Sequence, residues 1–235
     1  MGTRGSALPQ TTPSRRGAPL ETIVIRPFAE HDREEVREIF RQHAQRGNPL
    51  RVYVEDEHLV RPILLDYYLD YEPDCSLVAE VNGTVAGYIV GSKDTKRYTR
   101  FLALRVLPRL VCRVVLKILT FQYRERRTYS TIWWFLTRAW RELPRPPLDR
   151  YPAHCHLAIV HRYRHLLLGR QLVDALAHHL RNSGIPGLHG IVLEEAGKDA
   201  LARALDSRVL AVRRTTVWDK WTGKRWDAKL LVREL

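Results

Sequence analysis

The hydrophobic positions of residues 151–182 follow two different periods, and the change between them predicts a strand followed by a helix. Residues 151–160, YPAHCHLAIV, carry no acidic or strongly basic side chain and end in an apolar run, which is typical of a buried strand. From Gly169 onwards apolar residues recur at helical spacing, at Leu172, Val173, Leu176, Ala177 and Leu180. A basic turn, residues 161–168, joins the two elements. A strand that leads through a tight turn into a helix favours anion binding, because the first N–H groups of a helix have no partner inside it.

The rest of the chain divides into elements of ordinary length. Asp32 and Glu35 have the spacing of a capping box at the start of a helix, and Asn82-Gly83 is the residue pair that a type I′ hairpin turn requires. The predicted elements are a strand over 21–28, a helix after Asp32, a helix over 57–71, a hairpin over 76–92, a strand over 188–193, a helix over 199–206 and two closing strands, the last over 227–233.

Residues 92–150 stand apart because they are both basic and apolar. They contain fifteen Lys and Arg and four Asp and Glu, which accounts for most of the formal net charge of +13 of the whole chain. Two helices are predicted, one over about 101–119 with a kink at Pro108 and one over about 130–143 that is rich in tryptophan. A cation recurs every four residues on the first helix, at Arg105, Arg109, Arg113 and Lys117.

We expect these two helices to cover the sheet and to bury their apolar faces against it, so that the basic stripe lies at a solvent edge near the mouth of a binding site. The other interpretations are a lid over an acceptor molecule bound in that site, a dimer contact, and a helix that lies in a membrane interface. Such a helix is too apolar to stand free in water, so its remaining faces require a partner.

Composition limits the compartment and the domain organisation of the protein but indicates no specific reaction. The chain has 235 residues and an excess of arginine, 32 against 7 lysines, which fits coding in a GC-rich genome as well as an anionic partner. Cys75, Cys112 and Cys155 lack metal-ligand spacing, so we predict reduced thiols, a cytoplasmic protein and no metal site. No apolar run is long enough to predict a membrane-spanning helix. Residues 1–20 are predicted to be a disordered basic tail, and residues 21–235 a single domain.

Three segments carry a resemblance to a known family. The segment AIVHRYRHLLLGRQLVDAL resembles the pyrophosphate loop of the GCN5-related N-acetyltransferases, R/Q-x-x-G-x-G/A, with Arg164 and Gly169 at two of its positions and Leu167 in place of the middle glycine. YPAHCHLAIV resembles the YPAHLHI strand of one branch of that superfamily, and residues 66–91 resemble its second and third strands. The resemblance implies an α/β fold with a mixed, mostly antiparallel sheet flanked by helices, and it makes 92–150 a helical insertion between strands three and four.

The resemblance also implies an activity, the transfer of an acetyl group from acetyl-CoA to an unidentified amine on a small molecule or a protein. Carried over, the family pattern places thioester-side backbone contacts on Leu157, Ala158 and Ile159. It places the pyrophosphate loop on His165, Leu166, Leu167, Leu168, Gly169 and Arg170, with Arg164 beside it. A homodimer stays open, as does a membrane surface or a nucleic acid as partner of the basic insertion.

Three residues are candidates for the general base: His156, His189 and Glu194. His154 and His156 share one face of the predicted strand, and each histidine has a structural alternative as a buried ring bonded to the backbone. The tyrosine that protonates the leaving thiolate in the family aligns with Ala204. This absence favours an alternative function, a catalytically impaired module that binds CoA or a partner. A second alternative is a binder of anionic membranes or nucleic acid.

Overall fold

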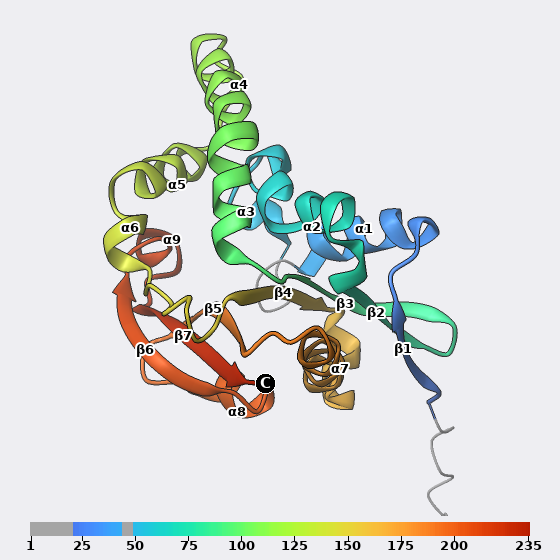
Figure 1. The fold of residues 1–235 in the computed structure, drawn as a ribbon. Coiled ribbons are helices and arrows are strands. Elements are labelled where there is room, and N and C mark those ends of the chain that lie inside the picture. The colour runs from blue at the N-terminus through green and yellow to red at the C-terminus, as the bar shows by residue number, and fades with distance from the viewer. Residues whose placement is uncertain (1–20, 44–48) are drawn as a thin grey trace, which may run out of the picture.

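The computed structural model describes residues 21–43 and 49–235 as an α/β fold, so the predicted tail 1–20 lies outside the described residues. Within them, seven strands form one sheet in the order β1-β2-β3-β4-β5-β7-β6 (Figure 1). The strands are β1 Ile23–Pro27, β2 Ser76–Val81, β3 Thr84–Ser92, β4 Ala153–Ile159, β5 Gly187–Glu195, β6 Arg208–Thr215 and β7 Trp226–Glu234. Neighbours pair antiparallel except β4 and β5, which pair parallel. The predicted fold class, a mixed and mostly antiparallel sheet flanked by helices, is confirmed.

The helices cover both faces of the sheet, with α1 and α2 on one face and α7 on the other (Figure 1). Their bounds are α1 Arg33–His43, α2 Tyr67–Tyr71, α3 Thr95–Phe101, α4 Leu107–Leu119, α5 Arg126–Thr137, α6 Ala139–Glu142, α7 Leu168–Asn182, α8 Ala200–Ala204 and α9 Asp219–Thr222. Two π-helical segments, Pro62–Asp66 and Leu102–Val106, run directly into α2 and α4. The turn between β2 and β3 has positive φ angles at Asn82 and Gly83, 52° and 78°, as its sequence predicts.

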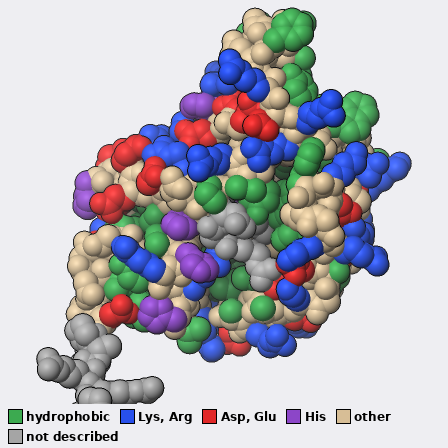
Figure 2. All heavy atoms as spheres, turned by 180° about the vertical axis from the view of Figure 1, so that it is seen from behind, with side chains coloured by type: hydrophobic (Ala, Val, Ile, Leu, Met, Phe, Trp, Pro, Cys, Tyr) green, Lys and Arg blue, Asp and Glu red, His purple; other side chains and the backbone are tan. Residues whose placement is uncertain are grey.

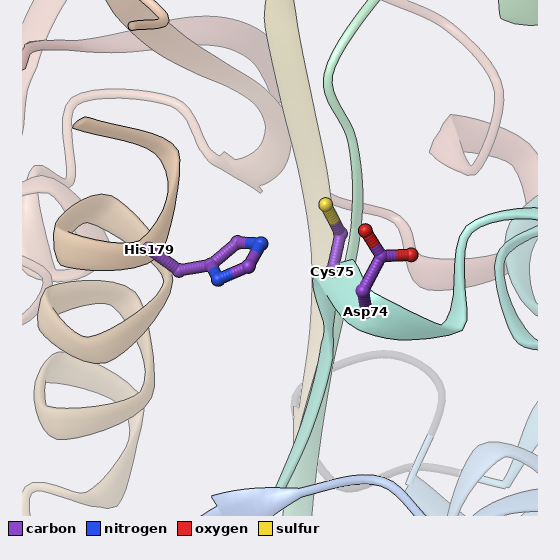
Figure 3. Close-up of side chains that lie close together, drawn as sticks. All are labelled: Asp74, Cys75 and His179. Atoms are coloured by element: carbon purple, nitrogen blue, oxygen red, sulfur yellow. The ribbon is translucent and has the colours of Figure 1, made fainter. Parts of the chain in front are cut away.

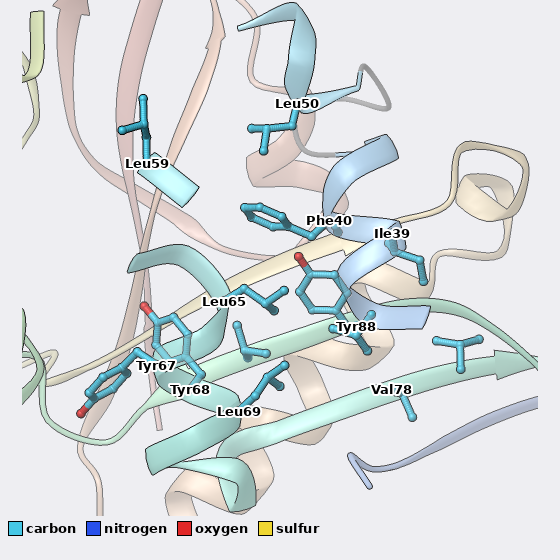
Figure 4. Packing of buried hydrophobic residues seen from close by; sticks show 14 of the residues in the cluster. Ile39, Phe40, Leu50, Leu59, Leu65, Tyr67, Tyr68, Leu69, Val78 and Tyr88 are labelled. Carbon is cyan, nitrogen blue, oxygen red and sulfur yellow. The ribbon is translucent and has the colours of Figure 1, made fainter. Parts of the chain in front are cut away.

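A core rich in aromatic rings fills the space between α1, α2 and the sheet (Figure 4). Tyr68 is fully buried there, and its ring stacks on Tyr98 of α3 at a centroid distance of 5.5 Å. On the opposite face α7 buries the predicted helical stripe, with Leu172, Leu176 and Leu180 at 0% exposure. The sheet is therefore apolar on both faces in its centre, which explains why β4 lacks alternation between polar and apolar residues.

The start of α1 differs from the predicted capping box. Asp32 accepts a hydrogen bond from the backbone N–H of Ala29, 2.8 Å away, and both of its oxygens bind the guanidinium of Arg26 at 2.7 Å. Arg26 also reaches Glu80 on β2. The carboxylate thus joins a strand to the helix instead of capping the helix alone. The capping-box spacing does not predict this ion pair, because Arg26 lies on β1 and reaches Asp32 only after the chain turns from the strand into the helix.

The helices α3 to α6 lie between β3 and β4, where the insertion was predicted. The π-helical segment Leu102–Val106 comes directly before α4 and contains Leu104, the residue four positions before Pro108. A proline ring interferes with the carbonyl four residues earlier, so the predicted kink takes the form of a local π-helical segment. The second helix begins at Arg126, earlier than predicted, and it ends at Thr137. The early start follows from Glu55, whose carboxylate accepts the N–H groups of Arg124 and Glu125.

The expected burial is wrong for α4, whereas Trp134 of α5 is buried against Trp218 and Trp226. The helix α4 projects away from the body of the molecule (Figure 1), and none of its residues is buried. The described residues 92–150 leave twelve large apolar side chains exposed, namely Leu104, Leu107, Val111, Val115, Leu116, Ile118, Leu119, Phe121, Trp133, Phe135, Leu136 and Trp140, besides Tyr129. No helix of residues 21–43 and 49–235 combines the length and the apolarity needed to cross a bilayer.

Candidate functional site

The strands β4 and β5 separate soon after they meet. Their parallel pairing consists of two residue pairs, Ala153 with Leu188 and His154 with His189, although both strands continue for several residues. Beyond His154 no described strand pairs with this edge of β4. The two strands therefore diverge in the centre of the sheet, and the edge of β4 beyond His154 has no strand partner among the described residues; we call this divergence the opening between β4 and β5.

Two of the three predicted backbone contacts face this opening. The N–H of Val160 donates to the carbonyl of Ala86 on β3, 2.9 Å away. Backbone groups of successive strand residues point to alternate edges, so Ala158 also turns to β3, where it pairs with Tyr88. The backbone groups of Leu157 and Ile159 consequently point to the open edge. Only these two of the predicted trio can hydrogen-bond a ligand that lies between the strands.

The predicted phosphate loop leads into the start of α7. Residues His161–Leu166 form a 3-10 turn, and Leu167 has φ 54° and ψ 27°, the left-handed conformation that a glycine adopts readily. Leucine thus keeps the backbone path that the missing glycine would take, and its side chain points outward with 58% exposure. In the described residues the N–H groups of Leu168 and Gly169 have no acceptor, as expected for the first turn of a helix.

The side chains around this loop have roles that the spacing did not show. A Cβ on Gly169 would lie 3.2 Å from Cδ2 of Leu205, so the absence of a side chain at this position permits close packing of α7 on the segment after α8. Arg170 pairs with Asp206 at 2.9 Å, which partly neutralises its charge. Arg164 and His161 lie close enough to His43 to contribute to lowering the pKa of His43, after the larger effect of burial. Arg170 is therefore not a free cation beside the start of α7.

Three histidines gather on the face of the sheet that also carries α2. The rings of His154 and His189 lie 5.7 Å apart, and those of His154 and His156 lie 6.4 Å apart. His154 is bonded through both nitrogens, to the Tyr68 hydroxyl at 2.8 Å and to Thr95 Oγ1 at 2.7 Å. Nδ1 of His189 lies 2.8 Å from the carbonyl of Tyr151. The His156 ring makes no hydrogen bond with another described residue.

Burial keeps this cluster neutral. It lowers the pKa of His154 well below the usual histidine range, and it lowers the pKa of His156 to about 4, with repulsion from His189 adding to the effect. Burial also lowers the pKa of His189, against the opposing effect of nearby backbone carbonyls. His156 is the member of the cluster whose ring nitrogens make no hydrogen bond with a described residue, and burial makes it a weak base.

Glu194 has a structural environment. It is fully buried, its Oε1 accepts the N–H groups of Ala200 and Leu201 at the start of α8, and its Oε2 lies 3.3 Å from the ammonium of Lys229. Alternation along β5 places it on the face opposite His189. The predicted role as a base does not fit these contacts. A buried glutamate at a strand end could have suggested an ion pair, but its lysine partner is 35 positions away.

The position that the family gives to a tyrosine is Ala204, an exposed residue at the end of α8. Three buried or half-buried tyrosine hydroxyls have partners of their own: that of Tyr68 bonds His154, that of Tyr151 contacts Glu234 and Arg208, and that of Tyr98 donates to the carbonyl of Ile63. Cys155 on β4 carries a free thiol whose pKa burial raises to about 12. Among residues 21–43 and 49–235, the position of the family's tyrosine therefore offers no acid to a leaving thiolate, and water is the remaining proton source.

One group of potential metal ligands lies outside this site. Asp74, Cys75 and His179 approach one another to within 4.8 Å, and the His179 ring points towards the other two (Figure 3). Cys75 is completely buried, and burial raises the pKa of its thiol to about 12, which disfavours the thiolate that a metal requires. The ammonium of Lys93 lies 2.9 Å from Asp74 and already satisfies its charge. The three side chains therefore form a packed cluster whose chemistry opposes a cation.

Comparison with known proteins finds similar solved structures but no matching family model. A solved structure of SsHAT is 23% identical with a TM-score of 0.65, over 91% of this chain and 98% of that one. The polyamine N-acetyltransferase of Drosophila melanogaster, which forms N-acetylagmatine, is 16% identical with a TM-score of 0.54, over 91% and 100% of the two chains. An N-acetyltransferase of Staphylococcus aureus Mu50 is 12% identical with a TM-score of 0.51, over 91% and 98%. These likenesses concern the fold.

Proposed function

We propose that this chain, which has the fold of the GCN5-related N-acetyltransferases, transfers an acetyl group from acetyl-CoA to an amine. The observation that carries the proposal is the opening between β4 and β5 beside the free N-terminus of α7. An extended pantetheine chain fits the open edge of β4 at Leu157 and Ile159, and a diphosphate fits the N–H groups of Leu168 and Gly169. One elongated ligand would thus span two features that are adjacent in sequence and open in the structure.

The bound thioester supplies an activated acyl carbon. In the proposed reaction the amine nitrogen forms a bond with that carbon, and the bond between carbon and sulfur breaks. The proton lost by the amine passes to water or to neutral His156, and the thiolate takes its proton from water. Because burial lowers the pKa of His156 to about 4, its basicity is weak, so we assign it the transfer of a proton through water and not the deprotonation of a free ammonium ion.

The left-handed backbone at Leu167 permits a sharp test of cofactor binding. Asn and Asp both tolerate positive φ, and both stabilise a helix start, but only Asp adds a negative charge where the diphosphate would lie. In calorimetric titration with acetyl-CoA, Leu167→Asp should weaken binding by about tenfold or more, equal to about 1.4 kcal/mol, while Leu167→Asn stays close to wild type. Equal affinities for acetyl-CoA in the two folded variants would contradict the assignment.

A second candidate function is a catalytically impaired module that binds CoA. The alanine at position 204 and the full hydrogen bonding of His154 favour it, since neither offers proton transfer. Release of the CoA thiol, followed with a thiol reagent over a panel of primary amines, separates the two. Binding of acetyl-CoA without release of thiol above the hydrolysis background, for polyamines, arylamines and amino-terminal peptides alike, would support the binding module.

A further inference from the structure

The projecting helix α4 packs Leu110 and Val114 towards the core and carries other apolar residues on the side away from the body. Leu107, Val111, Val115 and Ile118 follow one another at spacings of four, four and three, which places them along one side of the helix. Their exposed fractions run from 37% to 53%, and Leu119 and Phe121 beyond them reach 67% and 85%. The hydrophobic side chains are visible at the tip and along the projection (Figure 2). We call these six residues the outer face of α4.

Polar contacts hold the opposite side of the helix to the body. The Lys117 ammonium lies 2.6 Å from Asp56 Oδ2, and Arg113 lies 3.7 Å from the same oxygen. Asp56 is nearly buried and also accepts from the Tyr123 hydroxyl at 3.3 Å. Burial alone would raise the pKa of Asp56, but the hydrogen bond and charge of Lys117 outweigh that effect and lower it. The cationic side is thus the docked side, and the outer face of α4 cannot turn inward without breaking this ion pair.

The exposed charge around the outer face has a single sign. Residues 95–121 contain seven Lys and Arg and no acidic residue. Of the basic stripe, Arg113 and Lys117 contact Asp56, whereas Arg105 and Arg109 remain exposed and Arg109 only donates to the carbonyl of Arg105. A projecting helix that exposes both an apolar strip and, on another side, two guanidinium groups favours a partner that is apolar and anionic at once.

The neighbouring helix presents a similar face made of aromatic residues. Tyr129, Trp133 and Leu136 lie four and three positions apart on α5, with exposed fractions of 38%, 65% and 68%. Trp140 on α6 is 55% exposed, and its ring lies under the guanidinium of Arg141 at 4.4 Å. Tryptophan and tyrosine beside arginine are favoured at the boundary between the acyl chains and the headgroups of a bilayer.

A second copy of the chain fits these observations less well. In a twofold dimer each outer face would contact its own copy, and no acidic residue of α4 would balance the positive charge that the two helices bring together. A nucleic acid would match the arginines but would leave the exposed leucines and tryptophans uncovered. We propose that the outer face of α4, with the aromatic face of α5, docks on the surface of a bilayer that contains anionic lipids. This proposal is independent of the proposed acetyl transfer.

Vesicle binding tests the proposal on the full-length protein. We expect the wild type to sediment with vesicles of phosphatidylcholine and phosphatidylglycerol, to bind pure phosphatidylcholine at least tenfold more weakly, and to dissociate partly as ionic strength rises. Valine offers a matched pair of variants. Val111→Gln with Val115→Gln alters the outer face, whereas Val24→Gln with Val212→Gln alters two valines of similar exposure, 43% and 52%, on β1 and β6.

The outer-face pair should lower the partition coefficient by at least tenfold, about 1.4 kcal/mol, and the control pair should leave it within twofold. Arg105→Gln with Arg109→Gln should abolish the preference for anionic vesicles and keep residual binding to neutral ones. Equal loss in the outer-face and control pairs, or no binding of the wild type to either vesicle, overturns the proposal. Sedimentation velocity showing a dimer that only the outer-face pair dissociates also overturns it, as does arginine-dependent binding to duplex DNA without vesicle binding.

Discussion

The Nε2 atom of His154 lies 2.8 Å from the hydroxyl oxygen of Tyr68, in the buried space between β4 and α2. With Thr95 Oγ1 on the other ring nitrogen, the imidazole is fixed in position at the point where β4 leaves β5. The two hydrogen bonds of His154 thus join β4 to α2, which carries Tyr68, and to α3, which carries Thr95. His154 therefore supports the geometry of the opening, and His156, two residues later, is left free for chemistry.

Removal of the Tyr68 hydroxyl should destabilise the fold. Tyr68→Phe leaves the buried His154 Nε2 without its partner, which costs about 1–3 kcal/mol in the free energy of unfolding. Tyr71→Phe is a matched control, because Tyr71 is 56% exposed and the same atom is deleted. Urea unfolding of both variants measures the difference. A loss in Tyr68→Phe no larger than in Tyr71→Phe would show that the bond contributes nothing.

Stability should fall as the solution becomes acidic, because folding lowers the pKa of His156 from 6.5 to about 4. Above pH 6.5 the ring is neutral in both states and contributes no pH dependence. Between pH 6.5 and about 4 the unfolded chain takes up a proton that the folded chain refuses, so up to about 3 kcal/mol of stability is lost. His156→Gln should reduce the slope of the free energy of unfolding against pH over that range.

If His156 relays the amine proton, His156→Gln should lower kcat about 10²-fold and leave the dissociation constant for acetyl-CoA unchanged. The low pKa moves the expected acidic limb of kcat/KM for the free enzyme to about pH 4, away from the ordinary value of 6.5. Single-turnover rates across pH 4–9 and calorimetry on the same protein check both statements. Full activity of His156→Gln would assign the proton entirely to water.

Glycine should be favourable at position 167, in contrast to its usual effect. Leu167 has φ 54° and is 58% exposed, so Leu167→Gly relieves about 1 kcal/mol of backbone strain and loses little buried surface. Leu116→Gly, at a leucine of 61% exposure inside α4, should instead cost about 1 kcal/mol. The two changes in thermal midpoint should therefore have opposite signs. Destabilisation by both would mean that the left-handed backbone is not the native one.

Lys229 should be far more important than an exposed lysine nearby. Its side chain is 3% exposed and pairs with the buried Glu194 and with Asp199, so Lys229→Met leaves an uncompensated charge and costs about 3–5 kcal/mol. Lys224 pairs with Glu195 at 2.6 Å but is 58% exposed, and Lys224→Met should cost less than about 1 kcal/mol. Chemical denaturation compares them. Recovery of most of the loss in Lys229→Met with Glu194→Leu would identify the unpaired carboxylate as its cause.

The parts of the fold that local pattern determines were predictable from sequence. The hairpin at Asn82-Gly83, the strand at 153–159 and the helix after Leu168 each depend on turn chemistry or on a hydrophobic period that a few neighbouring residues contain. The start of α5 was not predictable in the same way, because it depends on Glu55, about 70 positions earlier. Contacts between distant residues decide such boundaries, and periodicity does not record them.

In the candidate site, too, features set by local sequence were predictable and features set by distant contacts were not. The loop and the opening follow from the order strand, turn and helix, and the backbone groups of Leu157 and Ile159 face the open edge of β4; their contact with a ligand stays a prediction. The predicted role of Glu194 does not fit, because its lysine partner comes from another strand. The prediction for α4 was wrong for a related reason. Its hydrophobic residues alone predict burial, but the ion pair between Lys117 and Asp56 fixes which side of the helix turns inward. Both wrong predictions, for Glu194 and for α4, concern residues whose position depends on a charged partner that hydrophobic periodicity does not reveal.

The short seam between β4 and β5 has a mechanical consequence. Strands β1 to β4 form one half of the sheet and β5, β7 and β6 the other, and two residue pairs join them. A ligand that hydrogen-bonds along the open edge would act as a missing strand and tie the halves together. Part of its binding energy would then appear as resistance of the entire molecule to heat and proteolysis. The ligand would be a structural component of the protein for as long as it stays bound, and the empty sheet would flex about its seam.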